Sequence, residues 1–497
     1  MKPFQIEIEN LGLGGFCTNY WKSDYATFGN RNQANMMRNM DLRNPNNITP
    51  GPSRQRLVNG DTSGILGTLV LRIMPRAFAS SETYGVAGKN ILKITPTTVT
   101  VDHAIDTTEM GAVVRATDIT EYHDDLYYVF DRTTAAKATI GKRTGASSYD
   151  DDYMERSTGD TVGTFSLTLD VPHKMLVGGD DILYITNGNK VSSYDKLTNI
   201  GVLAAIDLPD DAVVTDIEWN SNKLIITVNW PNLTGSNRLF QRVYVWDTVS
   251  ESWDQDVPQV RKGSGLFTKD GVTFMFYEDV TSDGVGRLGY FDGRTIKEVC
   301  QFNGTIPSFY QIDEKDGFVT WVSRVGSEDL IFCWGTNDTK LNARLFQLMR
   351  GHHSYMGAIG LPFGSLIVAS ENGVTGGDNI KTNLSKEAGY DWDSYWYGMT
   401  FETSLDEKNS VVRKLTADFD QLKVGSETVL KLRNNAGTEL FRGTLSYGRL
   451  GRKTKKIYTM VRRAENCRLE MDNRTGFSST TTIVLIKKAI ISGYSVK

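Results

Sequence analysis

The segment FTKDGVTFMFY, residues 267–277, carries the pattern that decides the fold. Two apolar stretches flank Asp270-Gly271, a dipeptide that tolerates the positive φ angles of a two-residue β-hairpin turn. The stretch after the turn is apolar at successive positions, as expected for a strand that is covered on both faces. The segment therefore predicts a hairpin within a stack of sheets.

The same hairpin pattern recurs along the chain. The further copies are YGVAGKNILKI (84–94), EYHDDLYYVF (121–130), VGGDDILYI (177–185), EWNSNKLIITV (218–228), IDEKDGFVTWV (312–322) and LPFGSLIVA (361–369). Anchors at Asn90, Asp125, Asp181, Lys223, Gly271, Gly317 and Gly364 are separated by 35, 56, 42, 48, 46 and 47 residues. These separations are typical of the four-stranded blades of a β-propeller.

A second motif supports the same register. Several units end a later strand with an aromatic residue followed by Asp or Gly: Tyr194-Asp195, Trp246-Asp247, Phe291-Asp292 and Trp334-Gly335. The aromatic ring can fill the space between blades, and the next residue begins a turn. We predict an all-β chain whose β-propeller has about seven blades, with six to eight compatible with the repeats. One or two β-sandwiches are the alternative arrangement of these strands.

Composition limits the classes of function. Of the 497 residues, 39% are hydrophobic and 10% aromatic, which indicates a globular chain, and the formal charge of −4 excludes a molecule built as a whole to bind a polyanion. The four cysteines are far apart and lack metal-site spacing, so we expect reduced thiols, no metal and no cofactor. The N-terminus lacks a secretion signal, and we expect synthesis in the cytosol.

The repeats also divide the chain. Residues 61–390 contain them and form the predicted propeller, and residues 391–497 continue with period-2 strands that predict a C-terminal β-sandwich. Residues 1–60 have little strand signal and are expected to form an extended N-terminal arm.

The arm carries aromatic and methionine side chains that need a surface to cover them, either on the chain's own propeller or on another subunit. We expect these residues to form an interface: Phe16, Tyr20, Trp21, Tyr25, Phe28, Met36, Met37 and Met40. A basic run in the C-terminal domain is a second candidate interface: Arg449, Arg452, Lys453, Lys455 and Lys456. A solvated loop is the simplest interpretation of that run, followed by docking on an acidic protein and then by contact with DNA.

The chain has no nucleotide-binding loop, zinc-protease motif or nucleophile elbow. Catalysis on a propeller would be glycoside hydrolysis by carboxylates at the channel mouth, for which the candidates are Asp118, Asp216, Glu218 and Asp313. Polar residues at strand ends explain them more simply, so no catalytic residue is assigned. The acidic run at 149–157 could bind calcium, but a solvated insertion between blades is favoured.

The segment ANMMRNMDLRNPNNITPGP, residues 34–52, followed by propeller repeats and a sandwich, resembles virion structural proteins of tailed bacteriophages. The likeness in sequence is confined to Asn39-Met40-Asp41-Leu42 through Gly51-Pro52. It implies a non-enzymatic tail hub, nozzle or neck component of the virion, assembled in the bacterial cytoplasm. Its implied partners are its own copies in a symmetric ring and adaptor, portal, tail or fibre proteins, with passing contact to phage DNA and no membrane. The alternative is a carbohydrate-binding or glycoside-cleaving propeller, such as a phage receptor-binding protein.

Overall fold

The computed structural model describes most of the chain. The described residues are 2–9, 34–38, 40–43, 49–59, 69–74, 81–110, 113–132, 137–155, 165–230, 241–259, 261–279, 284–337, 342–350, 356–370, 384–388, 394–398, 401–402, 410–419, 427–434, 437–446, 454–463, 466–474 and 486–495. Nearly all of their regular structure is strand. Within these ranges the short exceptions are α2 (Thr107–Met110) and two 3₁₀ turns, η1 (Tyr153–Glu155) and η2 (Phe309–Gln311).

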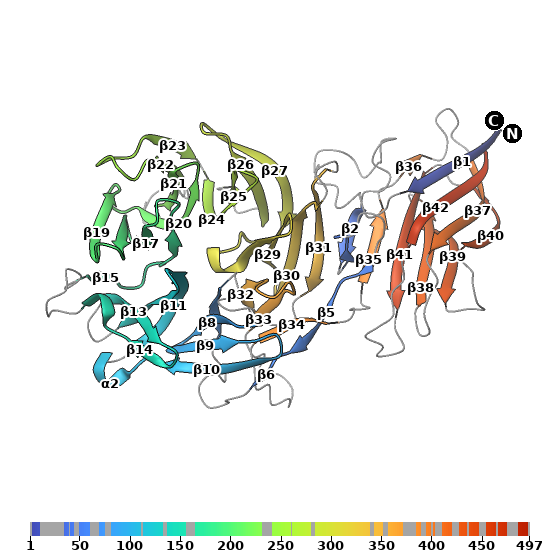
Figure 1. Ribbon diagram of the computed structural model, residues 1–497. Coiled ribbons are helices and arrows are strands. Elements are labelled where there is room, and N and C mark those ends of the chain that lie inside the picture. The colour runs from blue at the N-terminus through green and yellow to red at the C-terminus, as the bar shows by residue number, and fades with distance from the viewer. Residues whose placement is uncertain are drawn as a thin grey trace.

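Seven sheets surround a central axis and form a β-propeller (Figure 1); their strands pair antiparallel except for the parallel pair of β6 and β10 in blade 1. Blade 1 contains β6 (Val58–Asn59), β7 (Val70–Ile73), β8 (Thr83–Ala87), β9 (Asn90–Ile94) and β10 (Thr98–Ala104). Blade 2 contains β11 (Val113–Tyr122), β12 (Asp125–Arg132), β13 (Lys137–Gly145), β14 (Ser148–Asp150) and β15 (Leu167–Thr168). Blade 3 contains β16 (Met175–Val177), β17 (Leu183–Asn187), β18 (Lys190–Asp195) and β19 (Ile200–Asp207).

The remaining blades follow in chain order. Blade 4 contains β20 (Val213–Asn220), β21 (Lys223–Asn229), β22 (Gln241–Trp246) and β23 (Gln255–Gln259). Blade 5 contains β24 (Arg261–Lys269), β25 (Val272–Asp279), β26 (Val285–Phe291) and β27 (Ile296–Asn303). Blade 6 contains β28 (Ile312–Lys315), β29 (Phe318–Val325), β30 (Glu328–Gly335) and β31 (Arg344–Arg350). Blade 7 contains β32 (Met356–Gly360), β33 (Ile367–Ser370), β34 (Leu384–Ala388) and β5 (Ser53–Arg56).

The ring is closed at both the inner and the outer side. The innermost strands contact one another in the order β7, β11, β16, β20, β24, β28 and β32, and β32 contacts β7 again. On the outer side, β5 comes from the N-terminal segment and pairs with β34, with Ser53 opposite Ala388. Blade 7 thus combines strands from both ends of the propeller sequence, which couples ring closure to the position of the N-terminal segment.

The turns between the first two strands of the blades explain the repeat. Asp270 and Gly271 have φ angles of 52° and 74°, and Asp316 and Gly317 have 54° and 82°. Two successive positive φ angles define the type I′ hairpin turn, which glycine, asparagine and aspartate tolerate best. The aspartates of the second motif also act as expected, because the Asp247 carboxylate accepts hydrogen bonds from the backbone N–H groups of Val249 and Ser250, at 3.0 and 2.8 Å.

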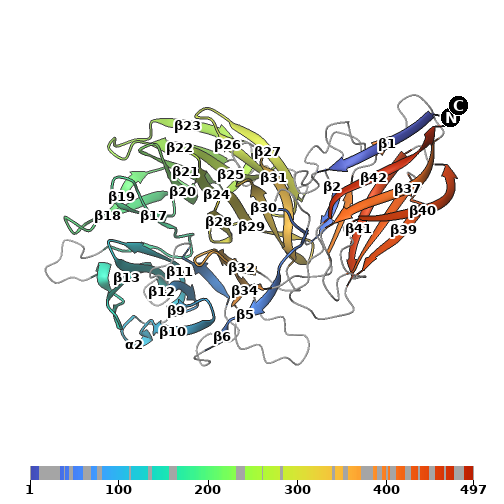
Figure 2. The same cartoon turned by 45° about the vertical axis from the view of Figure 1, so that its right-hand side comes forward.

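The second domain packs two sheets around an apolar core. One sheet has the order β1 (Lys2–Glu9), β42 (Ile486–Ser495), β37 (Ser410–Phe419) and β40 (Thr454–Arg463). The other has the order β2 (Ala34–Arg38), β35 (Ser394–Gly398), β41 (Asn466–Arg474), β38 (Glu427–Asn434) and β39 (Glu439–Ser446), with β36 (Phe401–Glu402) beside β41. Side chains of both sheets, such as Leu415 and Leu432, belong to one buried cluster. Figure 2 shows this domain at the side of the propeller.

The prediction of an extended N-terminal arm is wrong for the residues that the structure describes. Strands β1 and β2 belong to the two sheets of the sandwich, β3 (Met40–Asp41) and β4 (Thr49–Pro50) form a hairpin, and β5 completes blade 7. Met37 and Met40 are 4% and 1% exposed in the chain's own core. Burial of their side chains offsets the entropy lost when an irregular segment is ordered, so no neighbouring subunit is needed for these two residues.

The N-terminal segment also joins the two domains. β2 and β3 contact β31, the outer strand of blade 6, and β3 contacts β35 of the sandwich. Arg344 of β31 is 3% exposed. Its guanidinium donates two hydrogen bonds to the carbonyl oxygen of Leu42, at 2.9 and 2.6 Å, and one to the carbonyl oxygen of Arg43, at 3.2 Å. Met37, Met40 and Leu42 lie in a buried cluster with side chains of blade 6 and of the sandwich. The propeller and the sandwich therefore share one core.

Candidate functional site

The inner strands enclose a cavity of about 990 Å³ on the propeller axis. Every blade supplies part of its wall: Arg72, Ile119, Lys174, Glu218, Leu266, Asp313 and Pro362 line it in the order of blades 1 to 7. Its wall also includes His123, Asp124 and Asp181, which lie in the turns between the first two strands of blades 2 and 3. All four carboxylates that the sequence singles out are on, or directly behind, this wall, in blades 2, 4 and 6.

Asp118 connects three blades. It lies on β11 at a β-bulge and is fully buried, and its carboxylate accepts hydrogen bonds from the N–H of Ile119 at 2.8 Å and of Met175 at 2.6 Å. Arg72 of blade 1 lies 3.0 Å from the same carboxylate. Burial raises the pKa of Asp118, and the Arg72 guanidinium opposes that rise. Because Met175 begins blade 3, one carboxylate holds blades 1, 2 and 3 together.

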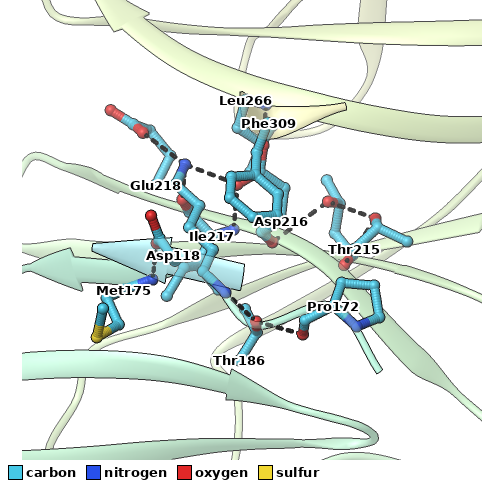
Figure 3. A network of polar contacts seen from close by, with 12 residues as sticks. Asp118, Pro172, Met175, Thr186, Thr215, Asp216, Ile217, Glu218, Leu266 and Phe309 are labelled. Atoms are coloured by element: carbon cyan, nitrogen blue, oxygen red, sulfur yellow. Dashed lines mark hydrogen bonds and ion pairs between the residues drawn. The ribbon is translucent and has the colours of Figure 1, made fainter. Parts of the chain in front are cut away.

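Asp216 repeats this arrangement two blades later (Figure 3). It also follows a bulge and is fully buried, and it accepts hydrogen bonds from Ile217 N at 2.8 Å and from Leu266 N of blade 5 at 2.5 Å. The Lys174 ammonium of blade 3 lies 2.6 Å from its carboxylate. The same ammonium donates to the carbonyl oxygen of Ile217 at 2.7 Å. Asp216 therefore holds blades 3, 4 and 5 together.

Asp313 is the third member of the series, but within the described residues no cation of the preceding blade forms an ion pair with it. It is 6% exposed and accepts a hydrogen bond of 2.5 Å from Leu361 N, directly after β32 of blade 7. In blade 3 the cation Lys174 directly precedes Met175. The equivalent position in blade 5, directly before Leu266, is Gly265, which has a φ of 67° and too little room for a Cβ atom beside Ile312. Blade 5 thus offers no cation at this position. Burial raises the pKa of Asp313 to about 7, and the hydrogen bond from Leu361 N and the charge of Arg72 in blade 1 oppose the rise.

We call Asp118, Asp216 and Asp313 the inter-blade carboxylates. Each bridges an even-numbered blade to the first strand or following turn of the next blade through a backbone N–H. A catalytic acid, base or nucleophile must have an oxygen that can reach substrate. The oxygens of these carboxylates are directed at backbone donors, so their geometry favours the interpretation of polar strand-end residues over that of catalytic residues.

Glu218 differs from these three because its side chain is 19% exposed; it lines the cavity, as does the more deeply buried Asp313. Its carboxylate lies 3.6 Å from the Lys174 ammonium. Burial raises the pKa of Glu218, and Lys174 opposes the rise. Glu218 and Asp313 both line the cavity and have raised pKa values, and the Glu218 side chain is the more exposed of the two.

The described part of the acidic run at 149–157 packs within the propeller and is not a solvated insertion. Asp151 is 7% exposed, and its carboxylate lies 2.8 Å from His103 Nε2 and accepts a 2.9 Å hydrogen bond from Asp106 N. The Tyr128 hydroxyl donates to the same carboxylate. These partners occupy the oxygens that a calcium ion would need. No group of three potential metal ligands occurs among the residues that the structure describes.

The predicted interface residues divide into three groups. Met37 and Met40 are buried within the chain, and the backbone of Met36 pairs with Tyr397 in the sandwich. Lys455 and Lys456 lie on β40, where they pair with Ala417 and Thr416. The remaining predicted interface residues lie outside the described residues: Phe16, Tyr20, Trp21, Tyr25, Phe28, Arg449, Arg452 and Lys453.

Sequence reasoning missed the cations of the channel and of the domain junction. Arg72, Lys174 and Arg344 each have an apolar neighbour and lie in or directly beside a strand. A lone cation in such a stretch needs a buried partner, and this is the signal that could have identified them.

Comparisons with known proteins found similar solved structures but no match by sequence. No protein-family model matches the chain, and no curated protein matches it. The propeller domain of the Trilobed protease from Pyrococcus furiosus is 11% identical, with a TM-score of 0.39 over 61% of this chain and 92% of that chain. Extracellular domains 1–2 of Drosophila Semaphorin 1a are 8% identical, with a TM-score of 0.43 over 68% of this chain and 88% of that chain.

Several similar solved structures are glycoside hydrolases. A family 43 arabinoxylan arabinofuranohydrolase from Bacillus subtilis, solved with cellotetraose, is 10% identical, with a TM-score of 0.28 over 86% of this chain and 97% of that chain. Likeness at this level concerns the architecture of the chain and carries no conclusion about its activity.

Proposed function

We propose that the protein is a non-enzymatic structural component of a multi-subunit particle, of the kind that forms the tail hub, nozzle or neck of a tailed bacteriophage. The observation that carries the proposal is the path of the N-terminal segment, which adds a strand to each sheet of the sandwich, contacts blade 6 and completes blade 7. Two domains that share a core in this way resist relative movement, a property that a spacer in a particle requires.

The channel supports the same function. Its fully buried carboxylates are paired with Arg72 and Lys174 and with backbone donors of the next blades. Truncating one partner of such a buried pair is strongly destabilising, so these residues contribute to the integrity of the ring.

The phage assignment is supported by the resemblance of residues 34–52, in which the likeness in sequence is confined to 39–52. In this chain the matching stretch supplies Met40 and Leu42 to the core between the domains. The resemblance therefore falls on residues that fix the two domains together. It follows that neighbouring subunits are contacted through other surfaces.

The experiment is co-expression of the full chain with the proteins encoded by the adjacent genes, followed by electron microscopy of the assemblies that co-purify. We expect the chain to be incorporated into a ring together with portal, adaptor or tail proteins. Recovery of the chain apart from every such assembly would contradict the virion assignment.

A carbohydrate-cleaving propeller is the second candidate function, because Glu218 lines the cavity with a raised pKa, as a general acid requires. Incubation of the full chain with a panel of polysaccharides, with release of reducing ends as the readout, separates the two candidates. Turnover that is abolished by Glu218→Gln would overturn the non-enzymatic proposal.

A further inference from the structure

The two ends of the chain carry opposite net charge. The C-terminal residues 391–497 contain 19 Lys and Arg against 12 Asp and Glu, an excess of seven positive charges. Blades 3 and 4, with residues 174–259, contain 12 Asp and Glu against 6 Lys and Arg, an excess of six negative charges. Figures 1 and 2 show blades 3 and 4 on the side of the propeller that faces away from the sandwich. The chain therefore has a basic end and an acidic end.

Ion pairs within the chain do not remove the negative excess of blades 3 and 4. Four of their cations pair with carboxylates of the same blades: Lys174 with Asp216, Lys190 with Asp207, Lys223 with Asp254 and Arg242 with Asp256. Lys196 pairs with Asp125 of blade 2. Among the residues that the structure describes, no Lys or Arg forms an ion pair with Asp180, Asp181, Asp195, Asp210, Asp211, Asp247 or Glu251. These carboxylates can attract a partner outside the chain.

Five of these carboxylates lie in or beside the turns that join the first two and the last two strands of blades 3 and 4, at the same end of the two sheets. We call them the acidic turn surface: Asp180, Asp181, Asp195, Asp247 and Glu251. The turns of the two blades touch, because the Thr248 hydroxyl donates to the Asp180 carboxylate at 3.2 Å. Val249 and Leu197 are 88% and 79% exposed in the same turns. The surface thus offers charge together with apolar side chains that a partner can bury.

We propose that the acidic turn surface of one copy docks on the sandwich of the next copy, head to tail. A second copy fits as the partner because the same chain carries the opposite excess of charge at its other end, and complementary charge fixes which surfaces meet. The shared core of the two domains holds the two ends apart, so one copy can contact two neighbours. Such a contact between two different surfaces closes into a ring when the rotation between copies allows it. The inference deepens the proposed function and rests on it, since it supplies the self-contact that a ring needs.

The basic run of the C-terminal domain belongs to the basic end. Lys455 and Lys456 lie on β40, the last strand of its sheet, and Arg449, Arg452 and Lys453 directly precede that strand in the sequence. Docking on an acidic protein is one of the interpretations of this run, and the acidic turn surface of a neighbouring copy is a partner of that kind. The proposal therefore gives the run a role in assembly.

The first test is sedimentation velocity of the full chain from about 1 to 100 μM, at about 0.1 M and about 1 M salt, between which the Debye length falls from about 10 Å to about 3 Å. Oligomers larger than a dimer are expected at the lower salt concentration, because each copy keeps one surface for a further copy. The higher salt concentration should raise the dissociation constant at least about tenfold, since it screens the attraction between the two ends.

Two charge-reversal variants test the two surfaces separately. Val249→Lys with Glu251→Lys blocks the acidic turn surface, and Lys455→Glu with Lys456→Glu blocks the basic end. Each variant alone should stay monomeric, whereas their equal mixture should form a 1:1 dimer and nothing larger, because only one compatible pair of surfaces remains. Thr97→Lys is the matched control, since Thr97 is exposed in the corresponding turn of blade 1, between β9 and β10, and should assemble like the wild type.

A monomer under every condition would overturn the inference, as would oligomers that persist in either variant alone. If the basic-end variant has a lowered melting temperature, an excess of the acidic-end variant added to the wild type replaces the mixture, and unshortened wild-type oligomers would then refute the contact. Retardation of duplex DNA by a chain that stays monomeric would assign the basic end to nucleic acid instead. Glycan turnover by a head-to-tail oligomer would refute the proposed function and leave the contact standing. Entry of both variants into virion assemblies as efficiently as the wild type would refute the contact and leave the function.

Discussion

Replacing Asp216 by asparagine tests whether the inter-blade carboxylates maintain the ring. The substitution keeps the size of the side chain and removes its charge. The Lys174 ammonium, 2.6 Å away, loses its closest counter-charge, and one of the N–H groups of Ile217 and Leu266 faces the new amide donor instead of an acceptor. Asp216 is fully buried, so water cannot replace these interactions.

The expected cost follows from the environment of the pair. Removing one partner of a buried ion pair typically costs about 3–5 kcal/mol, a large part of the 5–15 kcal/mol that stabilises a folded domain. For a domain of roughly 300 residues, this loss lowers the melting temperature by about 5–8 °C. The amide of Leu266 should also exchange faster with solvent, because its acceptor has changed.

The assay is scanning calorimetry combined with hydrogen exchange, with Asp254→Asn as the control. Asp254 forms an ion pair with Lys223 at 2.9 Å, with 27% and 42% of the two side chains exposed, and such surface pairs contribute at most about 1 kcal/mol. The double variant with Lys174→Met measures the coupling between the two charges. A stability of Asp216→Asn within about 1 kcal/mol of the wild type would refute the claim that the inter-blade carboxylates maintain the ring. Loss of a glycan-cleaving activity at unchanged stability would make Asp216 a catalytic candidate again.

Three further predictions concern the channel and the domain junction. The pKa of Asp313 is about 7 in the folded chain and 3.8 ordinarily, so between these pH values the folded state keeps a proton that the unfolded state has lost, and stability falls as the pH rises. Asp313→Asn should remove the fall in melting temperature that this proton causes across the range, and an unchanged pH dependence would contradict the prediction. Arg344→Met should lower the stability by about 1.5–3 kcal/mol, because it removes the hydrogen bonds to the Leu42 and Arg43 carbonyls, and should speed proteolysis of the N-terminal segment. A cleavage rate equal to that of the wild type would show that the domain junction does not depend on these hydrogen bonds. Deleting residues 1–59 should destabilise both domains, whereas deleting residues 1–9 should destabilise the sandwich alone; calorimetry reports the two domains as two transitions. A propeller transition that is unchanged by the longer deletion would mean that β5 is dispensable for ring closure.

The sequence determined the class of fold because the relevant signals are local. Two-residue turns such as Asp270-Gly271 require positive φ angles, and the aromatic-aspartate pairs such as Trp246-Asp247 end strands with a side chain that caps the next turn. Both signals arise within a few residues, so their repetition along the chain predicted the blades and their approximate number.

The sequence also placed the candidate carboxylates on the inner strands, but it could not assign their role. Whether Asp118 is catalytic or structural depends on Met175 and Arg72, which are supplied by other blades. The distinction between Asp216 and Asp313 depends in the same way on Lys174 in one blade and Gly265 in another.

The tertiary structure alone decided the position of the N-terminal segment. Residues 34–41 have weak strand propensity, and their strands exist because β35 lies beside β2 and because the core between the domains accepts Met37 and Met40. The energy that orders such a segment comes from contacts with residues more than 300 positions away in the chain, such as Arg344 with Leu42. Local pattern contains no information about such contacts, and this is the physical reason that the sequence predicted an extended arm where the folded chain has strands that belong to both domains.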